Sequence, residues 1–588
     1  MNATLKNILR TAWNEPRHFF FWIALLGLSG FVAVLVGSGL RTTGSLLPLV
    51  ALGCALCFLF GATLFIAALI PPLRRLLTRM LGHRFLVLGC LATLVALFYA
   101  VEDWRGRRAW QSLKHEREAH GEPLDLSRLV PPPVPDEQNF FSTPLWNDLH
   151  FVRTNDRITW SDTNWGSHVI FSAFGPGNGN APSLGNWSKS QPVNLSGWQA
   201  FYRGTNNLFA GPAGIATNYF PVAKEPQSPA QDVLEALSRF AENRQLLIEA
   251  GQRPQARFWI NYEAGPAMLL PHLARVKGTI QYLSLHASAS LKVGQVQTAL
   301  EDVKLEFRLL DSIRREPILI SHLVRIAGLQ IALQPVWEGL AARQWSESDL
   351  RSIQGGLDQM DFLADYRFAM RGELACELWA VDYVHREGLS GWEQLAAPDQ
   401  EGSGQDELMR FLGKGLFRLI PSGWFDESKI SICQLHQEFI LALVDSKAEV
   451  VSPARVKESQ SAFATRHWGL RDIFAKMLLP AYGRAIERFA RGQASLQLAR
   501  LGCALERYRQ GQGQYPETLE ALAPHFIEKV PVDVINGAPL KYQRQDDDQF
   551  TLYSVGWNER DDGGQIILTT TGNQDSNRGD WVWRYPAG

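Results

Sequence analysis

Four acidic residues near the middle of the chain have a spacing that could bind a pair of metal ions. Asp361 and Asp365, and further on Glu373 and Glu377, lie four residues apart, which places each pair on one face of a helix. Di-metal sites in helical bundles also use Glu-x-x-His motifs on neighbouring helices. No such motif accompanies these pairs. The pattern therefore favours ordinary surface carboxylates over a di-metal centre.

The histidines do not match a metalloprotease motif. His115 and His120 are five residues apart, whereas HExxH needs a spacing of four so that both rings reach one metal from one helix face. A solvated charged helix explains this segment better. His272, His286 and His322 lie in helical surroundings, which favours hydrogen-bonded structural histidines over metal ligands. GxSxG, DxDxDG and Walker motifs are also missing, so hydrolase, calcium-hand and ATPase functions have no specific support.

The cysteines form no redox or disulfide framework. Cys54 and Cys57 lie in an apolar run without an accompanying turn or histidine, which favours small-residue packing over a redox or zinc site. Cys376, Cys433 and Cys503 are widely spaced. One disulfide plus a free thiol, or three buried thiols, both agree with this spacing.

The balance of charges excludes one class of function. The chain has 588 residues, with 58 Lys and Arg against 59 Asp and Glu, and a net charge of -1. Because there is no overall positive field, we do not expect a nucleic-acid-binding protein. The length allows about three to five domains at roughly 100–200 residues each.

Three uncharged apolar segments near the N-terminus predict a multi-domain membrane protein. Phe19–Leu40, Ser45–Ile70 and Phe85–Val101 are long enough to cross a hydrocarbon core of about 30 Å at about 1.5 Å per residue. The third is near the lower limit for a span. A cleaved signal peptide fits the first segment less well, because its apolar stretch exceeds the roughly 7–15 residues of such peptides. We therefore expect three transmembrane helices, and their lack of charge argues against transport.

Positive charges in the short loops predict the orientation. The segment before the first span and the loop after the second are rich in Lys and Arg, whereas the first loop has only Arg41. The N-terminus and the second loop should therefore be cytoplasmic. Three spans in a bacterial inner (cytoplasmic) membrane then make the chain after about residue 101 periplasmic or extracytoplasmic. The charges counted are Lys6, Arg10, Arg17, Arg74, Arg75, Arg79 and Arg84.

Composition divides the chain into five regions. Residues 1–104 form the membrane anchor, and residues 105–139 a charged helix followed by a proline-rich stalk. Residues 140–227 are rich in Trp, Asn and Gly, which predicts short strands and loops. Residues 228–480 have the periodicity of an α-helical array, and residues 481–588 form an α+β domain.

Local signals define the first helices of the array. Ser228, Pro229 and Gln231 form a capping box with proline at the first helical position. Apolar residues recur at helical spacing on both sides of Gly294, which predicts a helical hairpin. This hairpin is similar to a tetratricopeptide-type helix pair, although no regular period of about 34 residues runs along the chain. A second capping box begins at Ser346.

The C-terminal region combines a helix with strand-like segments. The predicted helix covers about residues 481–510 and ends at a Gly-Gln-Gly break. A helix packed on a small antiparallel sheet is the physical interpretation. The motifs that follow the helix are, in order, Tyr515–Leu522, Val530–Asp533, Gly537–Tyr542, Phe550–Gly556 and Asp561–Gly564.

This motif order resembles the periplasmic domain of type II secretion major pseudopilins, with their YPxTLxAL, PxDPWGxPxxY and YSxGxDGxxGG segments. The resemblance covers about residues 481–583 and implies a pseudopilin-like α+β fold. An acidic loop of that family binds calcium, and Gly579–Trp583 is similar to its Asp-Ile-x-x-Trp ending. The resemblance thus implies Asp561, Asp562 and Asp580 as calcium ligands, and their oxygen atoms suit this ion. A solvated turn with a capping aspartate is the alternative.

Two further comparisons qualify this resemblance. Pseudopilins begin with a short leader and an apolar helix that bears a glutamate, and no such segment precedes the domain. Assembly into a pilus is therefore not expected. The whole chain also resembles uncharacterised envelope proteins of planctomycete and verrucomicrobial type, which share a stretch similar to Pro131–Asn139. That likeness names no activity.

These patterns favour a non-enzymatic, membrane-anchored scaffold or docking protein of the cell envelope, with a link to protein secretion. Its expected partners are the lipid bilayer and other envelope proteins, without a nucleic acid or an identified small-molecule substrate. The alternative is an envelope enzyme such as a glycan hydrolase, with a site in residues 140–221. There, tryptophans could stack on sugars, and Asp148, Asp156 or Asp162 could supply the carboxylates.

Overall fold

A computed structural model gives the fold of the chain. It describes residues 84–149, 151–154, 157–160, 181–205, 220–388, 391, 419–467, 469, 472–478, 482–545, 549–570, 572, 574–575 and 578–585. The predicted spans Phe19–Leu40 and Ser45–Ile70 lie outside these residues.

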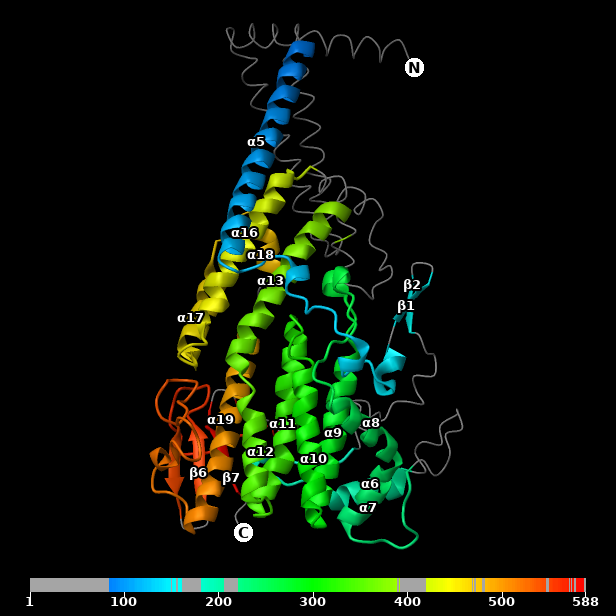
Figure 1. The fold of residues 1–588 in the computed structure, drawn as a ribbon. Helices are drawn as coiled ribbons and strands as arrows, with labels where there is room; N and C mark the ends of the chain where they lie inside the picture. The colour runs from blue at the N-terminus through cyan, green and yellow to red at the C-terminus, as the bar shows by residue number, and fades with distance from the viewer. Residues whose placement is uncertain are drawn as a thin grey trace, which may run out of the picture. The chain divides into compact units, whose positions relative to one another are not determined.

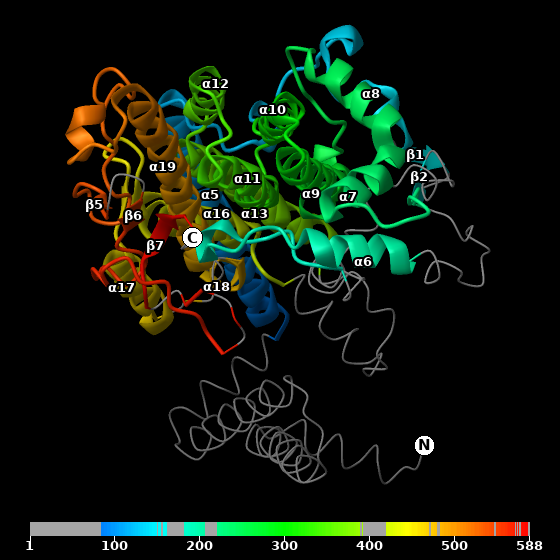
Figure 2. The ribbon, with the colours of Figure 1, turned by 90° about the horizontal axis from the view of Figure 1, so that it is seen from below.

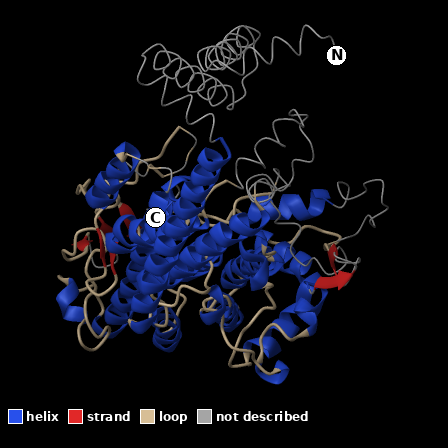
Figure 3. Cartoon of the chain, turned by 90° about the horizontal axis from the view of Figure 1, so that it is seen from above, coloured by secondary structure: helices blue, strands red, loops and turns tan. Residues whose placement is uncertain are grey.

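Most of the described residues are helical (Figure 3). The α-helices are α5 (Arg84–Ala119), α6 (Leu195–Thr205), α7 (Pro229–Leu237), α8 (Ala241–Gly251), α9 (Pro271–Lys292), α10 (Val296–Ser312), α11 (Leu319–Ala341), α12 (Glu347–Asp358), α13 (Phe362–Glu387), α16 (Ser422–Phe439), α17 (Pro453–Thr465), α18 (Ile473–Leu478) and α19 (Tyr482–Gln512). The strands are β1 (Phe151–Thr154), β2 (Arg157–Trp160), β3 (Val444–Asp445), β4 (Val450–Val451), β5 (Lys541–Arg544), β6 (Phe550–Ser554) and β7 (Trp581–Arg584).

The chain divides into two compact units. Unit 1 consists of Met1–Arg108 and Val384–Asp426, and unit 2 of Ala109–Tyr383 and Glu427–Gly588. The predicted anchor region therefore shares a unit with a later segment of the chain. The predicted helical array and the C-terminal region pack together in unit 2, so residue 480 does not separate two cores.

In unit 1, α5 and the start of α16 meet at two glycines. A Cβ atom on Gly106 would lie 2.2 Å from the carbonyl oxygen of Gly423, and one on Gly423 would lie 2.1 Å from that of Glu102. The missing side chains thus allow the two backbones to touch. The indole Nε1 of Trp424 also donates a hydrogen bond of 2.9 Å to Glu102 Oε2.

Helix α5 joins the third predicted span and the predicted charged helix into one element of 36 residues. From Gly89 to Ala100, every residue except the half-buried Tyr99 is exposed. Among the described residues, α11 is the one helix that is both long and apolar enough to cross a membrane. Since 61% of its apolar window is buried inside the protein, α11 is a core helix of unit 2.

The long helices α9, α10, α11, α12 and α19 of unit 2 run side by side (Figure 1, Figure 2). The hairpin of α9 and α10 is confirmed, and Gly294 in its turn has a φ of 79° that favours glycine. Both predicted capping boxes are also confirmed. Ser228 caps α7 together with Gln231, and Ser346 caps α12 together with Asp349. Local sequence signals therefore set the starts of these helices.

The C-terminal part of unit 2 is a three-stranded antiparallel sheet in the order β5-β6-β7. Its central strand β6 is buried along its whole length, and α19 packs against β6 and β7. Gly502 of α19 allows this approach, because a Cβ there would lie 3.0 Å from the indole Nε1 of Trp583. The predicted packing of a helix on a small antiparallel sheet is confirmed.

Residues 140–227 differ in part from the strands and loops expected of them. β1 and β2 form an antiparallel hairpin, but α6 is a helix of 11 residues. Trp198 of α6 is 1% exposed and contacts Tyr202 at a ring-centroid distance of 5.6 Å. Tryptophans of this region thus help to pack a helix, which the Trp-rich composition did not predict.

Candidate functional site

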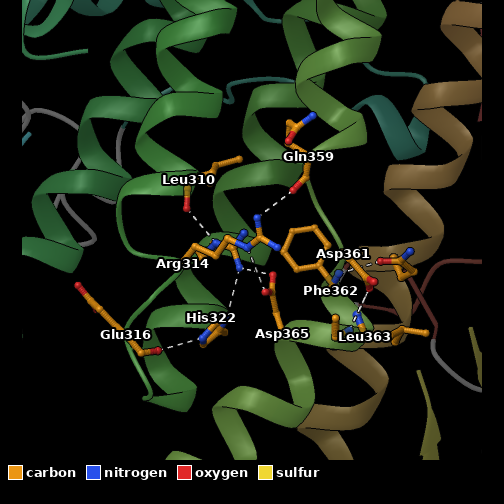
Figure 4. A network of polar contacts seen from close by, with 12 residues as sticks. Leu310, Arg314, Glu316, His322, Gln359, Asp361, Phe362, Leu363 and Asp365 are labelled. Carbon is orange, nitrogen blue, oxygen red and sulfur yellow. Dashed lines mark hydrogen bonds and ion pairs between the residues drawn. The ribbon is translucent and has the colours of Figure 1, made fainter. Parts of the chain in front are cut away.

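A buried ion-pair network lies between α10, α11 and α13 (Figure 4). Asp365 of α13 is 6% exposed and pairs with Arg325 of α11. Its other oxygen lies 3.4 Å from Nε of Arg314, and Arg325 Nε donates 2.8 Å to the carbonyl oxygen of Leu310. The prediction of a surface carboxylate at Asp365 is therefore wrong. A spacing of four residues reports a shared helix face, but not whether that face meets solvent or another helix.

His322 of α11 belongs to the same network in its neutral form. Its Nε2 lies 3.0 Å from the carbonyl oxygen of Glu316, which can only accept, so Nε2 carries the proton. Its Nδ1 then accepts from Nη1 of Arg325 at 3.3 Å. Burial, aided by the positive charge of Arg325, lowers the pKa of His322 to about 4.

The side chain of Glu316 extends the network to α9. Its Oε1 lies 2.8 Å from Nε2 of His272, which is fully buried. Its Oε2 accepts a hydrogen bond from the hydroxyl of Ser321. The imidazole of His272 stacks on the ring of Phe258 at a centroid distance of 4.0 Å. Ring stacking links Phe258 to His272, and hydrogen bonds and ion pairs continue from His272 through the network to Arg314.

Each end of this network reaches a pocket of unit 2. Pocket A, of about 450 Å³, is lined by Asp311, Arg314, Arg315 and Asp365, together with residues of the segment before Phe258. Pocket B, of about 400 Å³, is bordered by Phe258 and neighbouring residues. Both volumes fall within the roughly 300–1,000 Å³ of ligand pockets.

The second acidic pair of α13 lies in another buried cluster. Glu377 is 6% exposed, and the hydroxyl of Tyr482 donates to it. Burial raises the pKa of Glu377 to about 8, with the neighbouring Glu373 adding to the shift. Burial also raises the pKa of Glu373, which accepts a hydrogen bond of 2.8 Å from the backbone N–H of Leu319. The prediction of a surface carboxylate at Glu377 is therefore wrong as well.

The three histidines of the helical array are hydrogen-bonded inside unit 2, as predicted. Beyond His272 and His322, the Nδ1 of His286 lies 2.6 Å from Oδ2 of Asp302. The other oxygen of Asp302 accepts 2.7 Å from Nε of Arg244. Among the described residues, no group of three or more His, Cys, Asp and Glu side chains could hold a metal ion.

The predicted calcium residues lie together in the loop before β7. Both oxygens of Asp580 accept backbone N–H groups, from Asp562 at 3.2 Å and from Gly564 at 2.7 Å. Asp562 accepts from the N–H of Gly579 at 2.8 Å, and Asp561 pairs with Lys541 at 3.2 Å. These side-chain hydrogen bonds thus stabilise the turn, as capping aspartates do. Burial raises the pKa of Asp580, and the charges of Asp562 and Asp561 add to this effect.

The remaining candidate residues from the sequence provide little evidence for a functional site. Asp156 and Asp162 lie outside the described residues, and so does the side chain of Asp148. Of the two possibilities for the later cysteines, the structure contains three buried free thiols. Burial raises the pKa of each of these thiols to about 12, so they are poor nucleophiles.

Sequence reasoning did not identify the two residues at the centre of the site, Arg325 and Glu316. Arg325 could have been found, since it falls within an apolar helix where a charge needs a partner. Glu316 precedes α11 in a short connection, and no local pattern marks it. The network mainly joins opposite charges and neutral rings in fixed geometry, which suits holding three helices in register.

No known protein family, characterised protein or solved structure matches this chain.

Proposed function

We propose that this protein is a non-enzymatic, membrane-anchored scaffold or docking protein of the cell envelope. The observation that carries the proposal is that α5 changes along its length from exposed apolar residues to charged residues. Leu94, Val95, Leu97 and Phe98 are each about half exposed or more, and together they form one broad face of the helix, opposite the small exposed residues Ala92 and Ala96. An uncharged helix with so large an exposed apolar face needs an apolar surrounding. From Glu102 onward the same helix is charged.

The described residues of α5 are too few in their apolar part to count as a full span, but a bilayer around this part of α5 agrees with the apolar segments that precede it in sequence. With three spans and a cytoplasmic N-terminus, the remaining chain would lie on the periplasmic or extracytoplasmic side of a bacterial inner membrane. In this arrangement Trp104, 62% exposed, lies at the membrane surface, where tryptophan is enriched.

The packing of unit 2 supports a scaffold role. Several acidic side chains within the helical array are paired with a basic residue or a histidine, as in the Arg325–Asp365 and His286–Asp302 pairs. Such pairing fixes the arrangement of helices and leaves the outer surface for partners. The pseudopilin-like motif order suggests that the C-terminal region docks components of a secretion system.

Crosslinking in native membranes tests the docking role. A tag at the C-terminus would allow purification of the full chain, and mass spectrometry would identify the crosslinked proteins. We expect secretin, pseudopilin or secretion ATPase subunits. Recovery of this protein alone, from cells that express those subunits, would contradict a docking role in secretion. The untagged full chain, crosslinked and purified in the same way, provides the matched control.

We also propose, from the pseudopilin resemblance, that the loop of Asp561, Asp562 and Asp580 binds calcium, although these three side chains are not gathered into a metal-binding group in the described structure. A cation there would offset the repulsion among the three carboxylates, which adds to burial in raising the pKa of Asp580. Chelation by EGTA should then lower the melting temperature of the detergent-solubilised full chain, and added calcium should restore it. An Asp562→Asn variant should lose this response. An unchanged melting temperature of the parent protein would remove the calcium proposal.

A further inference from the structure

A dense set of hydrogen bonds holds one short segment at the wall of pocket B, residues 136–142. The side chain of Arg253 donates from Nη1 to three carbonyl oxygens of this segment, those of Asp136, Asn139 and Ser142, at 2.7, 2.9 and 2.7 Å. Backbone hydrogen bonds between Phe140 and Gln255 and between Gln255 and Gln138 join it to the segment that follows α8. The proline-rich stretch that stood out in the sequence thus ends in a rigid pocket wall.

The opposite wall of pocket B is held just as firmly. Asn139 binds the backbone of Arg257 twice, accepting from its N–H at 2.8 Å and donating to its carbonyl oxygen at 2.9 Å. Phe258 is 3% exposed and anchors the wall in the core. The side chains of Arg257 and Trp259, on either side of Phe258, are therefore presented from a fixed backbone. Fixed walls are typical of preformed ligand sites.

Three side chains of pocket B offer complementary chemistry. Trp259 is 56% exposed although it is a large aromatic residue, and it lines the pocket. The Nε of Arg257 is buried and has no hydrogen-bond partner among the described residues. The Oδ1 of Asp136 accepts from the hydroxyl of Ser142 at 2.8 Å, which orients the carboxylate at the pocket wall.

We propose that pocket B binds a saccharide that carries a carboxylate, such as a uronic acid. The apolar face of a sugar ring stacks on an indole such as that of Trp259. The planar guanidinium of Arg257 matches a carboxylate in charge and shape. Asp136 accepts hydrogen bonds from sugar hydroxyls. This inference is independent of the docking role, because it concerns a ligand and residues outside the C-terminal region.

Isothermal titration of the detergent-solubilised full chain tests the proposal. The probes are short oligomers of glucuronic, galacturonic and mannuronic acid, and each is compared with its methyl ester, which keeps the sugar rings and removes the charge. We expect saturable binding of at least one acid and binding of its ester that is at least about tenfold weaker. Equal binding of acid and ester, or no binding of any acid, would overturn the proposal.

Variants connect the binding to pocket B. Trp259→Ala and Arg257→Gln should each weaken binding of the acid by at least about tenfold, and Arg257→Gln should reduce the preference for acid over ester. Trp104→Ala and Arg351→Gln replace an exposed tryptophan and an exposed arginine outside the pocket, and they should leave binding unchanged. Unaltered binding in both pocket variants, with unchanged melting temperatures, would place the ligand elsewhere and contradict the assignment.

Discussion

The charge of Asp365 is held inside unit 2 by two arginines from different elements. Arg325 is 1% exposed and Arg314 is partly exposed. Burying a charge is costly unless an opposite charge and hydrogen bonds compensate for it. Removing one member of such a group leaves the others uncompensated, so the network should be sensitive to single substitutions.

Asp365→Asn should lower the free energy of unfolding by about 3–5 kcal/mol, because it leaves Arg325 as a buried charge without its counterion. Chemical denaturation of the detergent-solubilised chain measures this loss. Asp311→Asn provides the control, since Asp311 is 58% exposed and pairs with Arg308 at the surface. The control should change stability by less than about 1 kcal/mol. Equal effects of the two substitutions would contradict a central role for Asp365.

Glu377 should make the stability of the protein depend on pH. Its pKa is about 8 in the folded protein, against an ordinary value of 4.5, so the folded state binds this proton more tightly than the unfolded state. The favourable contribution is complete below about pH 4.5 and is lost as pH rises toward 8. At about 1.4 kcal/mol per pKa unit, the loss is on the order of a few kcal/mol.

Glu377→Gln, which mimics the protonated acid, should remove this part of the pH dependence. Melting temperatures between pH 5 and 9 provide the measurement. We expect the two proteins to differ little near pH 5 and the variant to become relatively more stable toward pH 9. Parallel curves across this range would show that Glu377 does not titrate inside the folded protein.

At the scale of elements, α13 approaches the connection before α11 through a glycine. A Cβ atom on Gly372 would lie 1.8 Å from the carbonyl oxygen of Pro317. Pro317 follows Glu316 of the polar network, and Gly372 precedes Glu373. This close approach therefore helps to position groups of both buried clusters on the neighbouring elements.

Gly372→Ala should destabilise the protein by about 1–3 kcal/mol, because the backbone of Pro317 must move to accept the methyl group. Gly355→Ala in α12 is the matched control, since a Cβ there meets nothing within 4 Å. It should stabilise the helix by about 0.5–1 kcal/mol. Thermal melts of both variants distinguish the two effects. A stabilising Gly372→Ala would argue against this packing.

Helix starts were more predictable than helix partners. The capping boxes at Ser228 and Ser346 use residues within one turn of each other, so the local sequence determines them. The environment of Glu377 depends on Tyr482, which lies 105 residues further along the chain. No local pattern reports such a contact. Asp365, Glu373 and Glu377 were therefore placed correctly on a helix, but Asp365 and Glu377 were placed wrongly at the surface.

At the scale of the whole molecule, the proposed anchor predicts where the protein is found in the cell. The full chain should sediment with membranes and resist alkaline carbonate extraction, because the proposed spans would be held by the bilayer. A chain that begins at residue 105 and is directed to the same compartment should be released into the soluble fraction. Release of the full chain by carbonate would contradict membrane spanning.

The sequence by itself determined the features that arise from local chemistry. These include the mostly helical composition, the hairpin at Gly294, the helix caps, and a C-terminal helix followed by strands. Each depends on backbone preferences and periodicities that act over a few residues. The apolar segments near the N-terminus are likewise a property of composition, and their place in a bilayer stays a prediction.

Only the tertiary structure decided which side chains meet. It joined the array and the C-terminal region into one unit through α11, α12 and α19. It buried Asp365 beside Arg325 and brought Asp136, Arg257 and Trp259 to one pocket. These contacts join segments from 40 to more than 100 residues apart. Their geometry follows from how whole helices pack, which no short stretch of sequence encodes.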